Sequence, residues 1–151
     1  MHIFKLLLLK IFMIRVEMQR VNGEFGFEAI DMAGSKVKLD TSPEDGGHNF
    51  GFRPMQLLLA SLGECSSIDI ISILKKQRQV VENFSLSLEG ERHPTEVPSL
   101  WTDIVMHFKL SGSIDREKAL KACALSIEKY CSVAETLRRA GAIITWDLQI
   151  N

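Results

Sequence analysis

The chain has 151 residues, a size that suits one compact domain. Hydrophobic residues make up 46% of it and charged residues 25%, a balance that excludes disordered, collagen-like and coiled-coil proteins. With a formal net charge of −1, one Tyr and two Trp, it has neither the positive field nor the stacking rings typical of nucleic-acid-binding proteins, so we expect no nucleic acid partner.

The chain has three cysteines, Cys65, Cys123 and Cys131. This number is small and odd, which argues against a secreted protein whose cysteines are all paired in disulfides. No two of them have C-x-x-C spacing, and the four His are scattered, so the sequence contains no zinc-binding motif. We therefore expect a cytoplasmic protein without a structural zinc site, whose thiols either fill the core or carry redox chemistry.

Residues 2–14 form an apolar run with flanking lysines, as at the start of a signal peptide. Lys10 interrupts this run, the run is too short to span a bilayer, and no small-residue cleavage site follows it. A regular strand pattern begins just after Met13. We therefore interpret residues 1–12 as an N-terminal extension and residues 13–151 as a single domain with no membrane partner; a membrane-proximal segment is the alternative.

The first part of the domain is predicted to form three strands. Alternation of apolar residues places them at residues 14–18, 25–30 and 37–39. Between the first two, Asn22-Gly23 predicts a type I′ hairpin turn, because both residues tolerate positive φ. Residues 41–53 follow as one loop rich in turn formers, and a loop of that length is often functional.

A long helix is predicted from Pro54 to about Arg78. Pro is favoured in the first turn of a helix, and only Gly63 interrupts the following helix-forming residues. Apolar residues cover almost the whole circumference, so the helix should be buried on every side. A monomer of this size cannot readily cover such a helix, and we therefore expect a homodimer.

The remaining sequence predicts two strands, two helices and a last strand. Alternating apolar residues place the strands at residues 84–89, 103–110 and 144–150. Asp115 can cap the first of the two helices, and Ser132-x-x-Glu135 has the form of a capping box that starts the other just after Cys131. Gly141 should end that helix. The predicted order is βββ-α-ββ-αα-β, an α+β domain.

Two of the cysteines have chemically distinctive surroundings. A narrow polar stripe along the long helix consists of Ser61, Cys65, Asp69 and Ser72. Such a stripe must face a partner, a cavity or water, although a lone Cys in a buried helix more often packs as a small hydrophobic residue. Cys131 directly precedes a helix, where free N–H groups favour a thiolate; packing at a helix corner is the alternative. Cys123 lies on an apolar helix face and is expected in the core.

Two motifs resemble those of a known family. Residues 54–65 (PMQLLLASLGEC) are similar to the P-x-x-L-L-x-A-x-x-x-x-C segment of the OsmC/organic hydroperoxide resistance (Ohr) family, and residues 128–133 (EKYCSV) resemble its second cysteine motif. The separation of the two cysteines and the predicted element order are also similar. Over residues 13–151 the chain is thus identified as a member of this family, which implies the OsmC-like fold and an intertwined homodimer with sites near the interface.

The resemblance implies a thiol-dependent peroxidase that reduces organic hydroperoxides or other peroxides. Cys65, as a thiolate, would attack the peroxide and become a sulfenic acid, releasing an alcohol. Cys131 would condense with it to a disulfide, which an external dithiol reductant reduces. The alternative is an OsmC-fold protein with little or no turnover that acts as a redox sensor or binds a small apolar ligand.

The chain departs from the family at the residues that activate the nucleophile. Family members use a Glu directly after the Pro to orient an Arg, and Met55 occupies that position here. Since Met55 cannot hold a guanidinium group, we expect the pKa of Cys65 to lie near that of an ordinary thiol and its peroxide reaction to be slow. Gln56 and Glu64 are possible substitutes for the family Glu. Arg20 is the candidate for the activating Arg, with Arg15 and Arg53 as competitors. The other interpretation of Arg20 is a solvated charge at the end of a strand.

Overall fold

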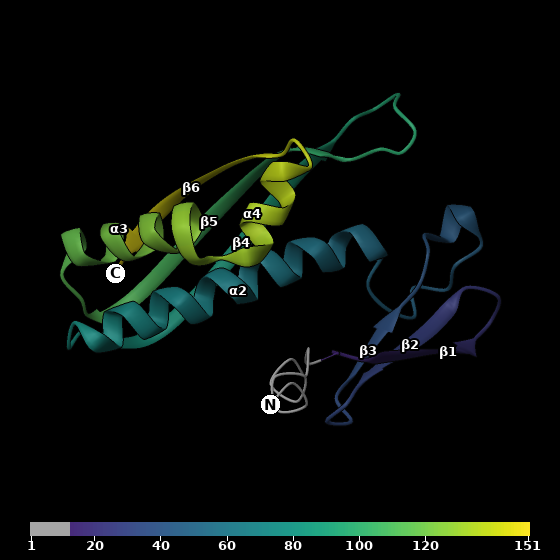
Figure 1. Cartoon of the computed structure of the whole chain (residues 1–151), viewed down its shortest axis with the longest axis horizontal. Helices are drawn as coiled ribbons and strands as arrows, with labels where there is room; N and C mark the ends of the chain where they lie inside the picture. Colours follow the sequence, from purple (N-terminus) through teal and green to yellow (C-terminus); the bar gives the residue numbers. More distant parts are fainter. Residues whose placement is uncertain (1–12) are drawn as a thin grey trace, which may run out of the picture. The chain divides into compact units, whose positions relative to one another are not determined.

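The computed structural model describes residues 13–151, so the interpretation of residues 1–12 lies outside the described residues. The chain divides into two compact units, one ending at Gln56 and one spanning Leu57–Asn151, which are described separately below (Figure 1). The element order is βββ-α-ββ-αα-β, and both this order and the α+β class predicted from the sequence are confirmed.

The first unit is an antiparallel sheet of three strands in the order β1-β2-β3. The strands are β1 (Val16–Asn22), β2 (Gly26–Asp31) and β3 (Lys36–Leu39). Gly23 has the positive φ (53°) expected of a turn residue, but β2 begins only at Gly26, so the connection is longer than the predicted two-residue turn. Val16 and Met18 are each 58% exposed, and the prediction of a half-buried first strand is wrong for this chain.

Asp40 organises the loop that follows β3. Its buried carboxylate accepts hydrogen bonds from the backbone N–H groups of Thr41 (2.8 Å), His48 (2.7 Å) and Phe50 (3.0 Å). These hydrogen bonds, the one from Phe50 foremost, lower the pKa of Asp40 and keep it ionised. The loop contains a short 3₁₀ helix, η1 (Pro43–Asp45), and is anchored by this single carboxylate.

The second unit is built on a mixed sheet in the order β4-β5-β6, with β4 and β5 antiparallel and β5 and β6 parallel. Its elements are β4 (Val80–Arg92), β5 (Trp101–Ser113), α3 (Arg116–Leu125), the π-helical turn η2 (Ser126–Tyr130), α4 (Ser132–Arg139) and β6 (Ile143–Ile150). Alternate residues of β5 form the centre of the core, namely Ile104, Met106, Phe108 and Leu110. The alternation predicted for this strand is therefore confirmed.

Helix α2 (Pro54–Lys76) lies directly on β4 (Figure 1). A Cβ atom added at Gly63 would stand 3.0 Å from Leu88 Cδ1 and 3.3 Å from Leu86 Cδ2, so the missing side chain lets the helix approach the strand closely. The helix has the length and composition of a membrane span. Its contact with β4 and its buried residues are those of a core helix, the buried apolar ones being Leu62, Ile70 and Leu74.

The opposite face of α2 is open in this chain. Leu58 and Ile71 are each 41% exposed, and Ile68 is 56% exposed. The prediction that the helix is buried on every side is therefore wrong for a single chain, because one sheet and the two short helices cover only part of its circumference.

Replacing Gly63 by Val is expected to lower the free energy of unfolding by about 1–3 kcal/mol, because the added methyl groups overlap Leu86 and Leu88. Denaturant unfolding measures the effect. Ala60→Val is the control, since it places the same β-branched residue at an exposed position of α2. Equal losses in the two variants would contradict the close approach of α2 to β4.

Candidate functional site

The thiols of Cys65 and Cys131 meet inside the second unit. Cys65 lies near the middle of α2 and Cys131 lies between η2 and α4, whose N-terminal end faces the middle of α2 (Figure 1). The two side chains lie close enough to interact, and both are free thiols. Cys65 is partly exposed and Cys131 is 2% exposed. The contact that a Cys65–Cys131 disulfide requires is therefore present, whereas the catalytic roles of the two residues stay predictions.

The first backbone amides of α4 point at both sulfur atoms. Cys131 Sγ accepts the Ala134 N–H at 3.4 Å, and the Val133 N–H lies near enough to Cys65 to lower the pKa of its thiol. Amides at a helix N-terminus carry partial positive charge, so the Val133 N–H favours a thiolate on Cys65.

Cys131 is itself the N-cap of α4, and the predicted capping box at Ser132 is wrong. Ser132 is already the first helical residue, so its side chain is past the capping position. Glu135, which a capping box would turn back toward the helix start, instead forms ion pairs with Arg138 (3.1 Å) and Arg139 (2.8 Å). By contrast, the predicted cap at Asp115 is confirmed, since its carboxylate accepts the Lys118 N–H at 2.9 Å.

Two fully buried serines, Ser66 and Ser126, lie near the thiols, and the Ser66 hydroxyl contacts one of them directly. The Ser66 hydroxyl donates to the Leu62 carbonyl (2.8 Å) and lies 3.5 Å from Cys131 Sγ. The Ser126 hydroxyl lies 3.2 Å from Asp69 Oδ2 and 3.3 Å from the carbonyl oxygen of Ser66. The polar stripe predicted from the sequence contains Asp69 but neither of these serines. Ser66 is adjacent to the polar stripe and was within reach of pattern analysis, whereas nothing in the sequence marks Ser126.

Burial raises the pKa of the Cys65 thiol above its ordinary value. The hydrogen bond with Cys131 and the negative charge of Asp69 act in the same direction, while the Val133 N–H opposes them. The resting form at neutral pH is thus the thiol. The pKa of Cys65 is therefore higher than expected from Met55, which predicted a pKa near that of an ordinary thiol.

Replacing Asp69 by Asn should speed the alkylation of Cys65 at pH 7 by roughly two- to tenfold, because it removes a negative charge that disfavours the thiolate. In the unmodified protein the alkylation rate should rise about tenfold per pH unit until the pH passes the raised pKa. Iodoacetamide labelling followed by peptide mass spectrometry measures both effects. Glu64→Gln is the control, since it removes an exposed carboxylate next to Cys65 in sequence; an equal gain there would contradict the specific effect of Asp69.

Cys123 is a core residue, as predicted. It is completely buried in α3, and burial raises the pKa of its thiol to about 12. It therefore stays protonated and unreactive at neutral pH.

Two hollows lie in this part of the second unit, and Tyr130 lines both. One, of about 610 Å³, lies beside Asp69 and has apolar walls from Ile73 and Leu125 as well as the Tyr130 ring. The other, of about 370 Å³, reaches Cys131 and carries the charged side chains of Lys129, Glu135 and Arg139. Of the two hollows, the charged one is lined by Cys131, whereas the one beside Asp69 is lined by neither thiol.

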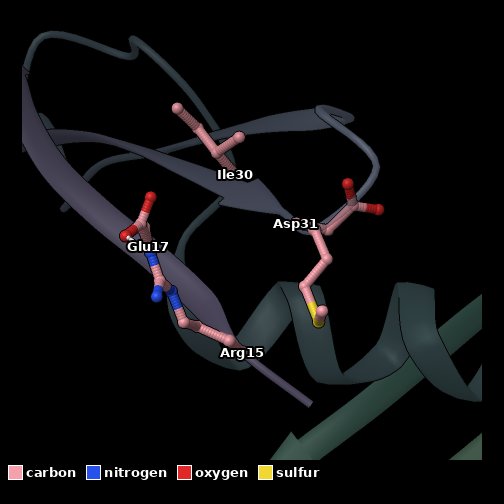
Figure 2. Close-up of a pocket in the computed structure, with 5 residues that line it drawn as sticks. Arg15, Glu17, Ile30 and Asp31 are labelled. Carbon is pink, nitrogen blue, oxygen red and sulfur yellow. Dashed lines mark hydrogen bonds and ion pairs between the residues drawn. The ribbon is translucent and has the colours of Figure 1, made fainter.

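A further hollow, of about 300 Å³, lies on the sheet of the first unit (Figure 2). Its charged groups already have local partners: Arg15 pairs with Glu17, and Asp31 accepts the N–H groups of Ala33 and Ser35. We assign it no function.

The residues proposed to activate Cys65 lie as follows. Arg20 is an exposed residue of β1 opposite Phe27, and its role stays a prediction. Gln56 accepts the Arg53 N–H at 3.2 Å, so its side chain is engaged at the start of α2. Met55 is half-buried in the first turn of α2 and Glu64 is exposed. Within residues 13–151 no three His, Cys, Asp or Glu side chains are grouped to hold a metal ion.

Several known proteins resemble this chain in sequence or structure. The family model for OsmC-like proteins matches residues 44–147. Protein YhfA of Escherichia coli K12 is 44% identical over 88 residues, which cover 58% of this chain and 65% of YhfA, just under two thirds of its length. A hypothetical protein from Aquifex aeolicus VF5 superimposes with a TM-score of 0.76 at 28% identity, covering 92% of this chain and 98% of the other. The organic hydroperoxide resistance protein OsmC from Legionella pneumophila gives a TM-score of 0.68 at 18% identity with the same coverage. The chain thus belongs to the OsmC-like family.

Proposed function

We propose that the chain is a thiol-dependent peroxidase that reduces organic hydroperoxides through the Cys65–Cys131 dithiol. The observation that carries the proposal is the interaction between these two free thiols, which come from different elements of the second unit. Similar folds include organic hydroperoxide resistance proteins from Legionella pneumophila and Bacillus subtilis, which supports a peroxide-related role.

The surroundings of the thiols suit the individual steps of this reaction. The Cys65 thiolate attacks one peroxide oxygen, the O–O bond breaks, and the alkoxide leaves and is protonated to an alcohol. The Val133 and Ala134 N–H groups stabilise negative charge on either sulfur. The apolar hollow beside Asp69 has room for the organic group of the peroxide.

Regeneration requires an external dithiol reductant, because the condensation of Cys65 sulfenic acid with Cys131 consumes both thiols. We propose no metal, haem or flavin cofactor, since the dithiol alone provides both electrons. We further propose a cytoplasmic location, where cellular reductants keep such thiols reduced, and a homodimer as the working form.

The raised pKa of Cys65 also gives weight to the alternative, an OsmC-fold redox sensor with little turnover. A thiol that is mostly protonated reacts slowly with peroxide, which suits a protein that reports oxidation more than one that removes peroxide in quantity.

Titration with one equivalent of cumene hydroperoxide tests the proposal. We expect the loss of two thiols per chain and a Cys65–Cys131 disulfide identified by mass spectrometry, followed by catalytic turnover when a dithiol such as dihydrolipoamide is supplied. Thiols that remain unreactive would exclude the peroxidase, and stoichiometric oxidation without turnover would favour the sensor.

A further inference from the structure

Two fully buried serines join α2 to the segment that carries Cys131. Ser66 belongs to α2 and Ser126 begins the π-helical turn that leads to Cys131; both are 0% exposed. Buried hydroxyl groups cost free energy unless they are hydrogen-bonded. Within residues 13–151 the buried serines are Ser66 and Ser126. The Ser66 hydroxyl contacts Cys131 Sγ, and the Ser126 hydroxyl contacts the Asp69 carboxylate.

Ser126 makes three contacts that together fix the position of Cys131. Its carbonyl oxygen accepts the Cys131 N–H at 2.9 Å. Its hydroxyl lies 3.2 Å from Asp69 Oδ2 and 3.3 Å from the carbonyl oxygen of Ser66. Asp69 is one helical turn after Cys65, and Ser66 directly follows Cys65. Ser126 therefore links the backbone of Cys131 to Ser66 and Asp69, two neighbours of Cys65 on α2.

A hydrogen bond fixes this register better than apolar packing does. Hydrophobic contact is non-directional, so two apolar surfaces tolerate small sliding, whereas a hydroxyl–carboxylate hydrogen bond has a narrow range of distance and angle. Disulfide formation demands such precision, because the two sulfur atoms must come within about 2.05 Å at a restricted dihedral angle. Attack of Cys65 on a freely diffusing peroxide makes no such demand on Cys131.

We propose that Ser126 is a positioning residue for the resolving step, holding Cys131 in line with Cys65 through Asp69 and Ser66. The inference rests on the proposed peroxidase function. In that step the Cys131 sulfur bonds to the sulfur of Cys65 sulfenic acid and the S–O bond breaks. The oxygen leaves as water, taking up the proton of the Cys131 thiol.

A matched pair of variants tests the hydroxyl by itself. Thr and Val have nearly the same shape, so Ser126→Thr and Ser126→Val crowd the core equally and differ in the hydroxyl group. After mixing with cumene hydroperoxide, loss of the Cys65 thiol reports the first step, while dimedone trapping and the Cys65–Cys131 disulfide report the second. We expect disulfide formation to be about tenfold slower in Ser126→Val than in Ser126→Thr, with sulfenic acid accumulating. The rate of Cys65 oxidation should agree within about twofold between the two variants.

Equal rates of disulfide formation in the two variants would overturn the inference, and so would an equal slowing of both steps, which indicates a general loss of structure. A second pair checks the partner: Asp69→Asn keeps an acceptor oxygen for Ser126 and should resolve normally, whereas Asp69→Leu lacks one and should resolve slowly. Normal resolution in Asp69→Leu would also contradict the proposal.

Redox titration in glutathione buffers separates this inference from the peroxidase proposal, because it forms the same disulfide without any peroxide. We expect the equilibrium constant for Cys65–Cys131 disulfide formation to be about tenfold lower in Ser126→Val than in Ser126→Thr. If the unmodified protein does not react with peroxide but the two equilibrium constants differ, the peroxidase proposal is wrong and the positioning role of Ser126 is supported. If the equilibrium constants are equal, the positioning role fails whatever the peroxide result.

Discussion

Replacing Cys65 by Ser is expected to abolish peroxide consumption completely. A Ser hydroxyl at neutral pH is a far weaker nucleophile than a thiol, and Cys131 and Cys123 are too buried to replace it. Peroxide consumption with a dithiol reductant, followed by a colorimetric peroxide assay, measures the loss. Cys123→Ala serves as the control and should retain turnover, since Cys123 lies in the core of α3 away from the reaction.

Cys131→Ser should retain the first oxidation but stop after one equivalent of peroxide. Cys65 sulfenic acid then has no thiol partner inside the chain, so dimedone should trap it and mass spectrometry should find it on Cys65. Oxidation of Cys131 in Cys65→Ser at the rate of the unmodified protein would mean that the roles of the two cysteines are reversed.

Replacing Ile68 by Glu is expected to convert a homodimer into a monomer. Ile68 is the most exposed large apolar residue of α2, and Leu58 and Ile71 extend the same open face. Burial of this face against a second copy removes the exposed apolar surface and supplies the dimer that the sequence predicts. In a two-fold symmetric dimer each substitution counts twice, so a buried unpaired carboxylate should weaken association by about a hundredfold or more.

Sedimentation velocity at micromolar concentration measures the change. Val97→Glu is the matched control, since Val97 is 98% exposed in the β4–β5 loop and also exchanges an apolar side chain for a carboxylate. A stable monomer before any substitution would contradict the expected dimer, and dissociation of both variants would remove α2 as the interface.

Local sequence patterns were sufficient for most of the fold. Alternating apolar residues located β5 because its inward side chains must be buried and its outward ones need not be. Asp115 capped α3 as expected, since capping depends on residues only three positions apart. The OsmC-like family was accessible for a similar reason, because both cysteine motifs are continuous segments.

Patterns failed where the outcome depends on distant residues or on competition between neighbours. Period-2 alternation indicates that β1 has an apolar side but not what covers it, and within residues 13–151 the strand is exposed along its whole length. The Ser132-x-x-Glu135 pattern suggested a capping box. In the structure Cys131 is the N-cap, and Glu135 forms ion pairs with Arg138 and Arg139.

The sequence by itself determined the element order, the family and which two cysteines have distinctive surroundings. Only the tertiary structure decided that Cys65 and Cys131 meet, that burial foremost keeps Cys65 protonated, and that Ser126 lies against Asp69 and Ser66 of α2. The physical reason is that a thiol's pKa and partner depend on groups within a few ångströms in space, and here those groups come from α2, η2 and α4. Cys65 and Cys131 become neighbours only when η2 and the start of α4 pack against α2. No local sequence pattern encodes that packing.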